Sequence, residues 1–245
     1  MSKINFTDFI EESKIKFGNN LKAIILFGSG ANSDFMQGVS DLDFIFIFEH
    51  LDFKTINIME KIEFEFSERF GSRVDIKPFT KSELLGAIKG IHSFGFFNGW
   101  ALRMIEEGKQ KLLYKTQDLS LEYQCPIERI RKDALDRASF YTTKLRKIMF
   151  LKRTMILDGE VRVLSDKDLI KICVSCCKNV LTFCLAYKGI VCDDVNSTIK
   201  SAERVFGSMN RIKRAYEIKQ QGKFDIQVLK DAYELVEEVY EKTIS

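Results

Sequence analysis

Residues 26–48, LFGSGANSDFMQGVSDLDFIFIF, constrain the fold more than any other stretch, because polar turn residues separate two strongly apolar runs. The run that ends at Gly28 and the run that begins at Asp41 are short and rich in β-branched and aromatic residues, which predicts two strands. A strand that is apolar on both faces must be covered on both sides. The sequence therefore predicts a sheet packed between helices, with aspartates at the mouth of a poorly solvated interior.

Asp41 and Asp43 open the second of these strands. Side chains alternate along a strand, so both carboxylates point to the same face, roughly 6–7 Å apart. Ile45 and Ile47 continue this face inward. The opposite face carries Leu42, Phe44, Phe46 and Phe48. Carboxylates are costly to desolvate unless positive charge offsets them, and hard oxygen ligands suit Mg²⁺, which commonly keeps phosphate ligands. The pair therefore predicts a magnesium and nucleotide site.

The turn after the first strand supports this interpretation. Gly28 and Ser29 follow the strand directly, and glycine lets the backbone approach a phosphate whose oxygens main-chain N–H groups and a hydroxyl can hold. No Gly-Lys-Ser/Thr follows, which excludes a Walker loop, and no G-x-G-x-x-G is present, which excludes the dinucleotide fingerprint.

A third strand, RVDIKPF over residues 73–79, supplies Asp75. If it lies beside the second strand, three carboxylates converge and can hold two metal ions, which suits in-line phosphoryl or nucleotidyl transfer. An Asp-x-Asp at a turn can also act only as a cap, and Asp75 could be an edge residue. The ordered combination of all these features favours the site.

The remaining pattern divides the chain into two parts. Before residue 120, helical periodicity over 4–17, 53–70 and 81–90 alternates with the strands. After Pro126 strand signals end, and four long helical patterns follow with short connections, over 127–156, 166–187, 197–220 and 225–243. We therefore expect an α+β protein, in which an α/β domain with a small mixed sheet (residues 1–120) precedes an all-α helical bundle (residues 121–245).

Five of the six cysteines fall within residues 173–192. Four of them follow helical spacing, which indicates the apolar stripe of a packed helix: Cys173, Cys176, Cys177 and Cys184. A zinc site or disulfides are the alternatives. The two histidines, His50 and His92, lie far from this cluster in sequence, and a cytosol keeps thiols reduced.

Composition excludes few classes of protein. The net charge of +3 implies neither a nucleic-acid nor a membrane partner. The first residues have no apolar h-region of a signal peptide. The most apolar window, residues 174–192, is interrupted by Lys178 and Lys188, so we interpret it as a buried helix and not as a membrane span. We expect a cytoplasmic protein.

In combination these elements resemble the DNA polymerase beta-type nucleotidyltransferase superfamily. The resemblance is based on the Gly28-Ser29 turn, on Ser40-Asp41-Leu42-Asp43 at the start of the next strand, and on Asp75. The resemblance covers roughly residues 20–90. The helical second half more loosely resembles the helical domains of antibiotic nucleotidyltransferases and of minimal nucleotidyltransferase–HEPN pairs. The HEPN ribonuclease signature, an Arg followed shortly by a His, is absent because no His follows His92.

The resemblance implies two groups of site residues. The carboxylates would bind two Mg²⁺ ions on a nucleoside triphosphate, and Asp75 would also help to activate the acceptor hydroxyl. The turn would hold the β- and γ-phosphates. The implied catalytic and metal-binding residues are Asp41, Asp43 and Asp75, and the implied nucleotide-binding residues are Gly28, Ser29 and Ser40.

The resemblance thus implies a Mg²⁺-dependent enzyme that moves a nucleoside monophosphate from an NTP, ATP first, to a hydroxyl acceptor. Residues 1–120 would be the catalytic domain and residues 121–245 an acceptor-binding or HEPN-like bundle, with a pocket between the lobes for an antibiotic-like small molecule or a protein. Basic runs with interleaved aromatics are missing, which argues against a nucleic-acid acceptor. Apolar helix surface leaves a homodimer open. The alternative is a non-catalytic nucleotide-binding or protein-interaction module on the same fold.

Overall fold

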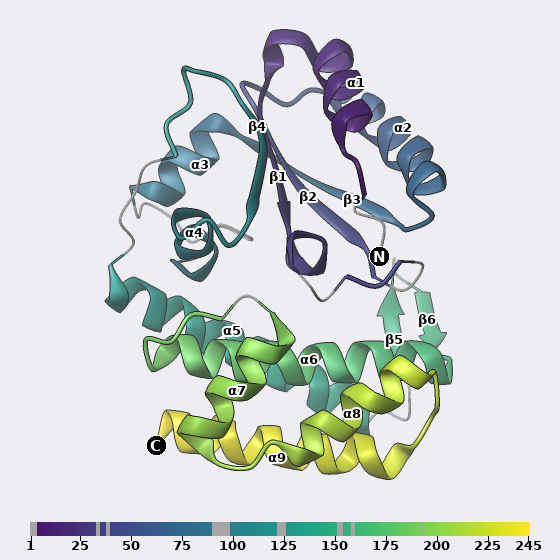
Figure 1. Cartoon of the computed structure of the whole chain (residues 1–245), viewed down its shortest axis with the longest axis vertical. Coiled ribbons are helices and arrows are strands. Elements are labelled where there is room, and N and C mark those ends of the chain that lie inside the picture. The colour runs from purple at the N-terminus through teal and green to yellow at the C-terminus, as the bar shows by residue number, and fades with distance from the viewer. Residues whose placement is uncertain are drawn as a thin grey trace. The chain divides into compact units, whose positions relative to one another are not determined.

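The structure is a computed structural model of the chain, and its units are shown in Figure 1. It forms two compact units, Met1–Cys125 and Pro126–Ser245. The residues that it describes are 4–32, 35–37, 40–89, 99–121, 126–150, 154–157, 160–192 and 194–245.

The N-terminal unit alternates helices with the strands of one mixed sheet. Its elements are α1 (Thr7–Phe17), β1 (Leu21–Phe27), β2 (Leu42–Phe48), α2 (Phe53–Phe70), β3 (Val74–Thr80), α3 (Lys81–Ile88), α4 (Gly99–Glu106) and β4 (Lys111–Lys115). The strand order is β3-β2-β1-β4. β1 runs antiparallel to β2 and β4, whereas β2 and β3 are parallel.

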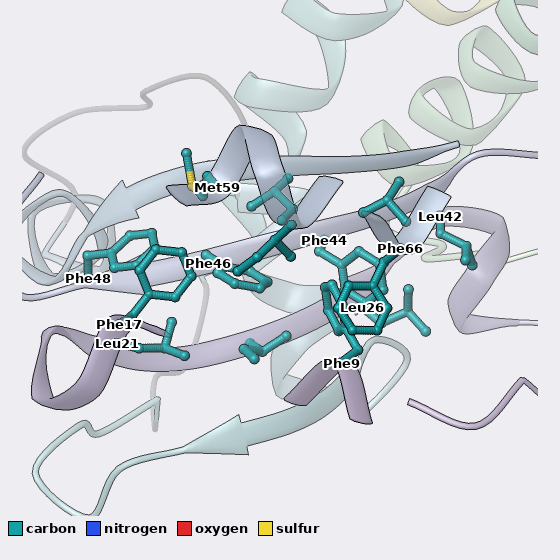
Figure 2. Packing of buried hydrophobic residues seen from close by; sticks show 14 of the residues in the cluster. Phe9, Phe17, Leu21, Leu26, Leu42, Phe44, Phe46, Phe48, Met59 and Phe66 are labelled. Carbon is teal, nitrogen blue, oxygen red and sulfur yellow. The ribbon is translucent and has the colours of Figure 1, made fainter. Parts of the chain in front are cut away.

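Different helices cover the two faces of this sheet (Figure 1). On one face, α1 and α2 pack over alternate residues of β1 and β2, among them Leu26 and Phe44. Figure 2 shows Phe9 of α1 and Phe66 of α2 close to these side chains. The ring centroids of Phe9 and Phe44 lie 4.5 Å apart, and those of Phe9 and Phe66 lie 4.9 Å apart. This aromatic cluster is the main core of the unit.

The other face is packed under α3 and α4. It buries Ile25 of β1 and Ile45 and Ile47 of β2 against Leu84 of α3 and Leu102 of α4. The predicted alternation along β2 is therefore confirmed, with isoleucines on one face and phenylalanines on the other. Because side chains alternate, residues 41 and 43 belong to the isoleucine face.

α2 connects the parallel strands β2 and β3, and local sequence features define where the helices begin and end. α2 begins after Asp52, whose carboxylate accepts a hydrogen bond from the Thr55 N–H at 2.7 Å. It ends at Gly71, which has a φ of +60°. Thr80 and Glu83 then form a capping box at the start of α3. A crossover helix between parallel strands returns the chain to the same edge, so β2 and β3 both begin at one end of the sheet.

In the part of the C-terminal unit that the structure describes, helices predominate and two short strands pair antiparallel. Its elements are α5 (Ile127–Phe150), β5 (Thr154–Leu157), β6 (Glu160–Val163), α6 (Asp166–Tyr187), α7 (Val195–Phe206), α8 (Asn210–Gln221) and α9 (Ile226–Ile244). The predicted fold class, an N-terminal mixed sheet followed by a helical bundle, is confirmed.

Two expectations about this unit are corrected. Residues 197–220 do not form one helix, because the chain breaks at Gly207, which has a φ of +97°. Strands also occur after Pro126. The first long helix, predicted over residues 127–156, ends at Phe150 as α5, and β5 and β6 follow it as an antiparallel pair. The residues between them in sequence are Asp158 and Gly159, and Asp-Gly between two short strands is a strong hairpin signal.

α6 is the central helix of the C-terminal unit. By length and composition it could cross a membrane, but 72% of its most apolar window is buried inside the protein. Cys173, Cys176, Cys177 and Cys184 are all buried along it. The interpretation of these cysteines as the stripe of a packed helix is therefore confirmed.

These thiols should be unreactive in the folded protein. Burial raises the pKa of Cys173 to about 12, and that of Cys176 and Cys184 to about 11, so little thiolate exists near neutral pH. We expect iodoacetamide at pH 8 to leave the peptides with these residues unmodified in native protein and to modify them fully in urea, as measured by peptide mass spectrometry. Rapid native alkylation of Cys176 would contradict the packing described for α6.

Candidate functional site

The register of the sheet brings two of the predicted carboxylates together. β2 and β3 pair Asp43 directly with Asp75. On the other side of β2, antiparallel pairing sets Phe27 opposite Asp43. Neighbouring strands lie about 4.8 Å apart, and residues in register point to the same face. Phe27, Asp43 and Asp75 therefore form a row across three strands, at the end of the sheet where β2 and β3 begin.

Lys77 lies on the same face as this row, opposite Ile45 of β2, and it was not among the site residues predicted from the sequence. Its Nζ lies 3.1 Å from Asp43 Oδ1 and 2.8 Å from Asp75 Oδ2. The same ammonium stands 4.9 Å from the centroid of the Phe27 ring. Lys77 follows Asp75 by two residues on β3, so strand alternation places both on one face. That spacing, Asp-x-Lys on a predicted strand, was the signal available in the sequence.

Burial and like charge act together on Asp43. Burial raises the pKa of its carboxyl group, Asp75 and Asp41 add to the rise, and Lys77 opposes it. Asp41 directly precedes β2 and is half-buried. For Lys77, burial lowers the pKa but the two carboxylates outweigh it, and the pKa is raised. The raised pKa favours the charged ammonium of Lys77 between the two carboxyl groups.

The glycine turn lies directly against Asp43. Gly28 begins a short 3₁₀ turn, Gly28–Ala31, and has a φ of +65°. A Cβ at this position would lie 3.1 Å from Asp43 Oδ2. The Ser29 carbonyl accepts a hydrogen bond from the Asn32 N–H at 3.2 Å. Glycine is therefore required here for backbone conformation and for space beside the carboxylate.

Ser40 has a different local role. Its hydroxyl accepts a hydrogen bond from the Met36 N–H at 3.1 Å, and its own N–H donates to the Met36 carbonyl at 2.8 Å. These bonds close the loop just before Asp41. A contact of Ser40 with nucleotide stays a prediction.

Glu63 of α2 also bears on the site. It accepts a hydrogen bond from the Ile76 N–H, on the edge strand β3. Burial raises the pKa of Glu63, and Asp75 adds to the rise while that backbone donor opposes it. Ile76 lies between Asp75 and Lys77 in the chain, so this hydrogen bond from its N–H to Glu63 helps to hold the part of β3 that contains both residues.

The carboxylates of Asp41, Asp43 and Asp75 are suitable ligands for a hard divalent cation, because Mg²⁺ prefers oxygen ligands of this kind. The space that a Cβ at Gly28 would fill lies beside Asp43 Oδ2. Within the described residues, no three His, Cys, Asp or Glu side chains are yet gathered as a metal-binding group. The Lys77 ammonium lies between Asp43 and Asp75 and donates a hydrogen bond to each carboxylate. The residues present therefore fit Mg²⁺ with one ammonium already among them.

Comparison with known proteins identifies the first unit. Residues 8–98 match the family model described as "Nucleotidyltransferase domain". No curated protein matches the chain. The prediction of a nucleotidyltransferase domain in this part of the chain is confirmed by this match.

Two solved structures are similar to the chain. The spectinomycin adenyltransferase AAD(9) from Enterococcus faecialis, determined with ATP and spectinomycin, has a TM-score of 0.58 and 14% identity, over 98% of this chain and 100% of that one. A nucleotidyltransferase-like protein from Exiguobacterium sibiricum 255-15 has a TM-score of 0.33 and 10% identity, over 96% of this chain and 74% of that one. The first likeness shows a fold shared with an antibiotic nucleotidyltransferase.

Proposed function

We propose that this chain, whose residues 8–98 form a nucleotidyltransferase domain, transfers a nucleoside monophosphate from a nucleoside triphosphate to a hydroxyl acceptor. The observation that carries the proposal is the row in which Asp43 pairs with Asp75 while Gly28 lies against Asp43. A carboxylate pair beside a turn that begins with glycine is an arrangement in which a charged triphosphate can approach the backbone closely.

The proposed roles of the residues are those that the family resemblance implies. Asp41, Asp43 and Asp75 would hold Mg²⁺, which when bound neutralises charge on the triphosphate; the family resemblance implies two ions. The backbone of Gly28 and Ser29 would position the phosphates. The acceptor oxygen would bond to the α-phosphorus as the bond to pyrophosphate breaks, and Asp75 would take the hydroxyl proton, as the family resemblance implies. Such chemistry needs positioning and charge compensation more than covalent catalysis.

For the acceptor we favour a small hydroxyl-bearing molecule of the antibiotic type, and for the donor ATP. The support is the likeness to AAD(9), which extends along both units of this chain and covers the whole of that protein. A polymerase-like acceptor is disfavoured, because basic runs with interleaved aromatics are absent from the sequence.

A direct test measures pyrophosphate release from ATP and Mg²⁺ across a panel of aminoglycoside and aminocyclitol antibiotics, spectinomycin included. We expect release with at least one of them, and a product heavier by one AMP in mass spectrometry. Transfer of label from ATP to a protein would instead identify a protein acceptor. Tight binding of ATP without release across the panel would support a non-catalytic module.

Gly28→Ala should weaken nucleotide binding beyond its effect on folding. A non-glycine residue at positive φ costs about 1–2 kcal/mol of stability, and the added Cβ would press on Asp43 Oδ2. Gly108 has the same φ of +65° with nothing within 4 Å of its Cβ position, so Gly108→Ala is the matched control. We expect both variants to lose similar stability in urea titrations. Only Gly28→Ala should lower ATP affinity in calorimetry, about 10-fold or more. Equal ATP affinities of Gly28→Ala and Gly108→Ala would show that the Gly28 turn is not part of the nucleotide site.

A further inference from the structure

Lys77 is the feature of the site that the proposed roles leave unused. Its ammonium is in contact with one oxygen of Asp43 and one of Asp75. The side chains involved are only partly exposed, at 33% for Lys77, 26% for Asp43 and 34% for Asp75. The Phe27 ring lies beside the same ammonium. Lys77 is thus held by two charges and an aromatic face, and is not a solvated surface lysine.

We propose that Lys77 acts as a built-in cation that takes the place of one of the two metal ions, so that this centre accepts a single divalent ion with its nucleotide. The inference rests on the proposed function, since it concerns how the same carboxylates are used. It revises the two-ion expectation that the family resemblance implies.

The first argument is steric. A metal ion bridging Asp43 and Asp75 would need to touch an oxygen of each carboxylate at about 2.0–2.1 Å. The Lys77 ammonium already bridges these groups, at 3.1 Å from Asp43 Oδ1 and 2.8 Å from Asp75 Oδ2. An ion in contact with the same two oxygens would overlap the Lys77 Nζ. The two cations therefore compete for one position.

The second argument is charge. Lys77 already brings one positive charge to the carboxyl groups of Asp43 and Asp75, and a second divalent ion would serve the same purpose. Expelling Lys77 would cost its ion pairs and its contact with Phe27, in a partly buried setting where charges interact more strongly than in water. A lysine two residues after Asp75 also cannot leave this face of the sheet without a change of strand register.

The test counts bound Mn²⁺ as a probe for the divalent ion. Wild-type protein saturated with α,β-methylene-ATP is titrated with Mn²⁺, and free Mn²⁺ is followed by electron paramagnetic resonance. We expect one ion per nucleotide-bound chain in the wild type and two in Lys77→Met, which keeps the length of the side chain without the charge. Lys77→Arg should keep one. Lys77→Gln is a second neutral replacement if Lys77→Met folds poorly.

Lys81→Met is the control for loss of a lysine. Lys81 lies beyond the other end of β3, paired with Asp118 and Glu49, so its variant should bind one ion. Two ions in the wild type would overturn the inference and leave the proposed function standing. One ion in both the wild type and the neutral Lys77 variants would show that Lys77 is only structural. Folded wild-type protein that binds nucleotide without Mn²⁺ would overturn the proposed metal site itself.

Discussion

Asp43→Asn should abolish nucleotidyl transfer while the protein stays folded. The change removes a charged oxygen ligand from the centre of the row formed by Phe27, Asp43 and Asp75. Charge compensation at the transferred phosphate is worth several kcal/mol, so we expect kcat to fall about 1000-fold or more. The measurement is pyrophosphate release with the acceptor found in the antibiotic panel.

Folding should not suffer from this change. Burial raises the pKa of Asp43, which means that the folded protein holds the ionised carboxylate at a cost. That cost is present at pH values above the raised pKa and disappears as the carboxyl group is protonated. Asparagine is neutral at every pH, so the free energy of unfolding of Asp43→Asn at pH 8 should equal or exceed that of the wild type.

Glu60→Gln is the matched control, because it removes one negative charge from an exposed position on α2. We expect its kcat to lie within a factor of about two of the wild type, as for a surface change away from the site. An Asp43→Asn variant with near wild-type turnover would rule out the carboxylate row as the catalytic centre, whatever the fold.

Phe44→Ala should cause the largest loss of stability in the N-terminal unit. Phe44 is fully buried, and its ring centroid lies 4.5 Å from that of Phe9 and 5.7 Å from that of Phe6. Truncating a buried phenylalanine loses transfer free energy and leaves a cavity, which together cost about 3–5 kcal/mol. We expect a decrease of this size in the free energy of unfolding from urea titration followed by circular dichroism.

Phe53→Ala provides the same chemical change at a surface position. Phe53 is the first residue of α2 and its side chain is 84% exposed, so the loss should stay within about 0.5 kcal/mol. A loss at Phe44 no larger than the loss at Phe53 would contradict the assignment of the phenylalanine face of β2 to the core. Because Phe44 neighbours Asp43 on β2, we also expect Phe44→Ala to lower transfer activity.

Strong local patterns determined much of this protein from sequence alone. Alternation along residues 42–48 predicted which side chains of β2 face each layer, and both layers were found. The helical spacing of the cysteines predicted the buried stripe of α6. These patterns depend on neighbours in the chain, whose directions the backbone periodicity dictates. Where a short break begins at a glycine, as at Gly207 between α7 and α8, the prediction of one continuous helix was wrong.

The candidate site depended on facts that lie between strands. The sequence identified Asp41, Asp43 and Asp75 as candidate metal ligands, but these carboxylates can act together only if β2 and β3 are neighbouring strands in the observed register. A shift of one residue in that register would turn the Asp75 side chain to the other face of the sheet. Lys77, 34 residues from Asp43 in the chain, became part of the site only through that pairing. Sequence therefore determined which residues could carry the chemistry. The tertiary structure decided which charges meet, because electrostatic interaction depends on distance in space and not on position along the chain.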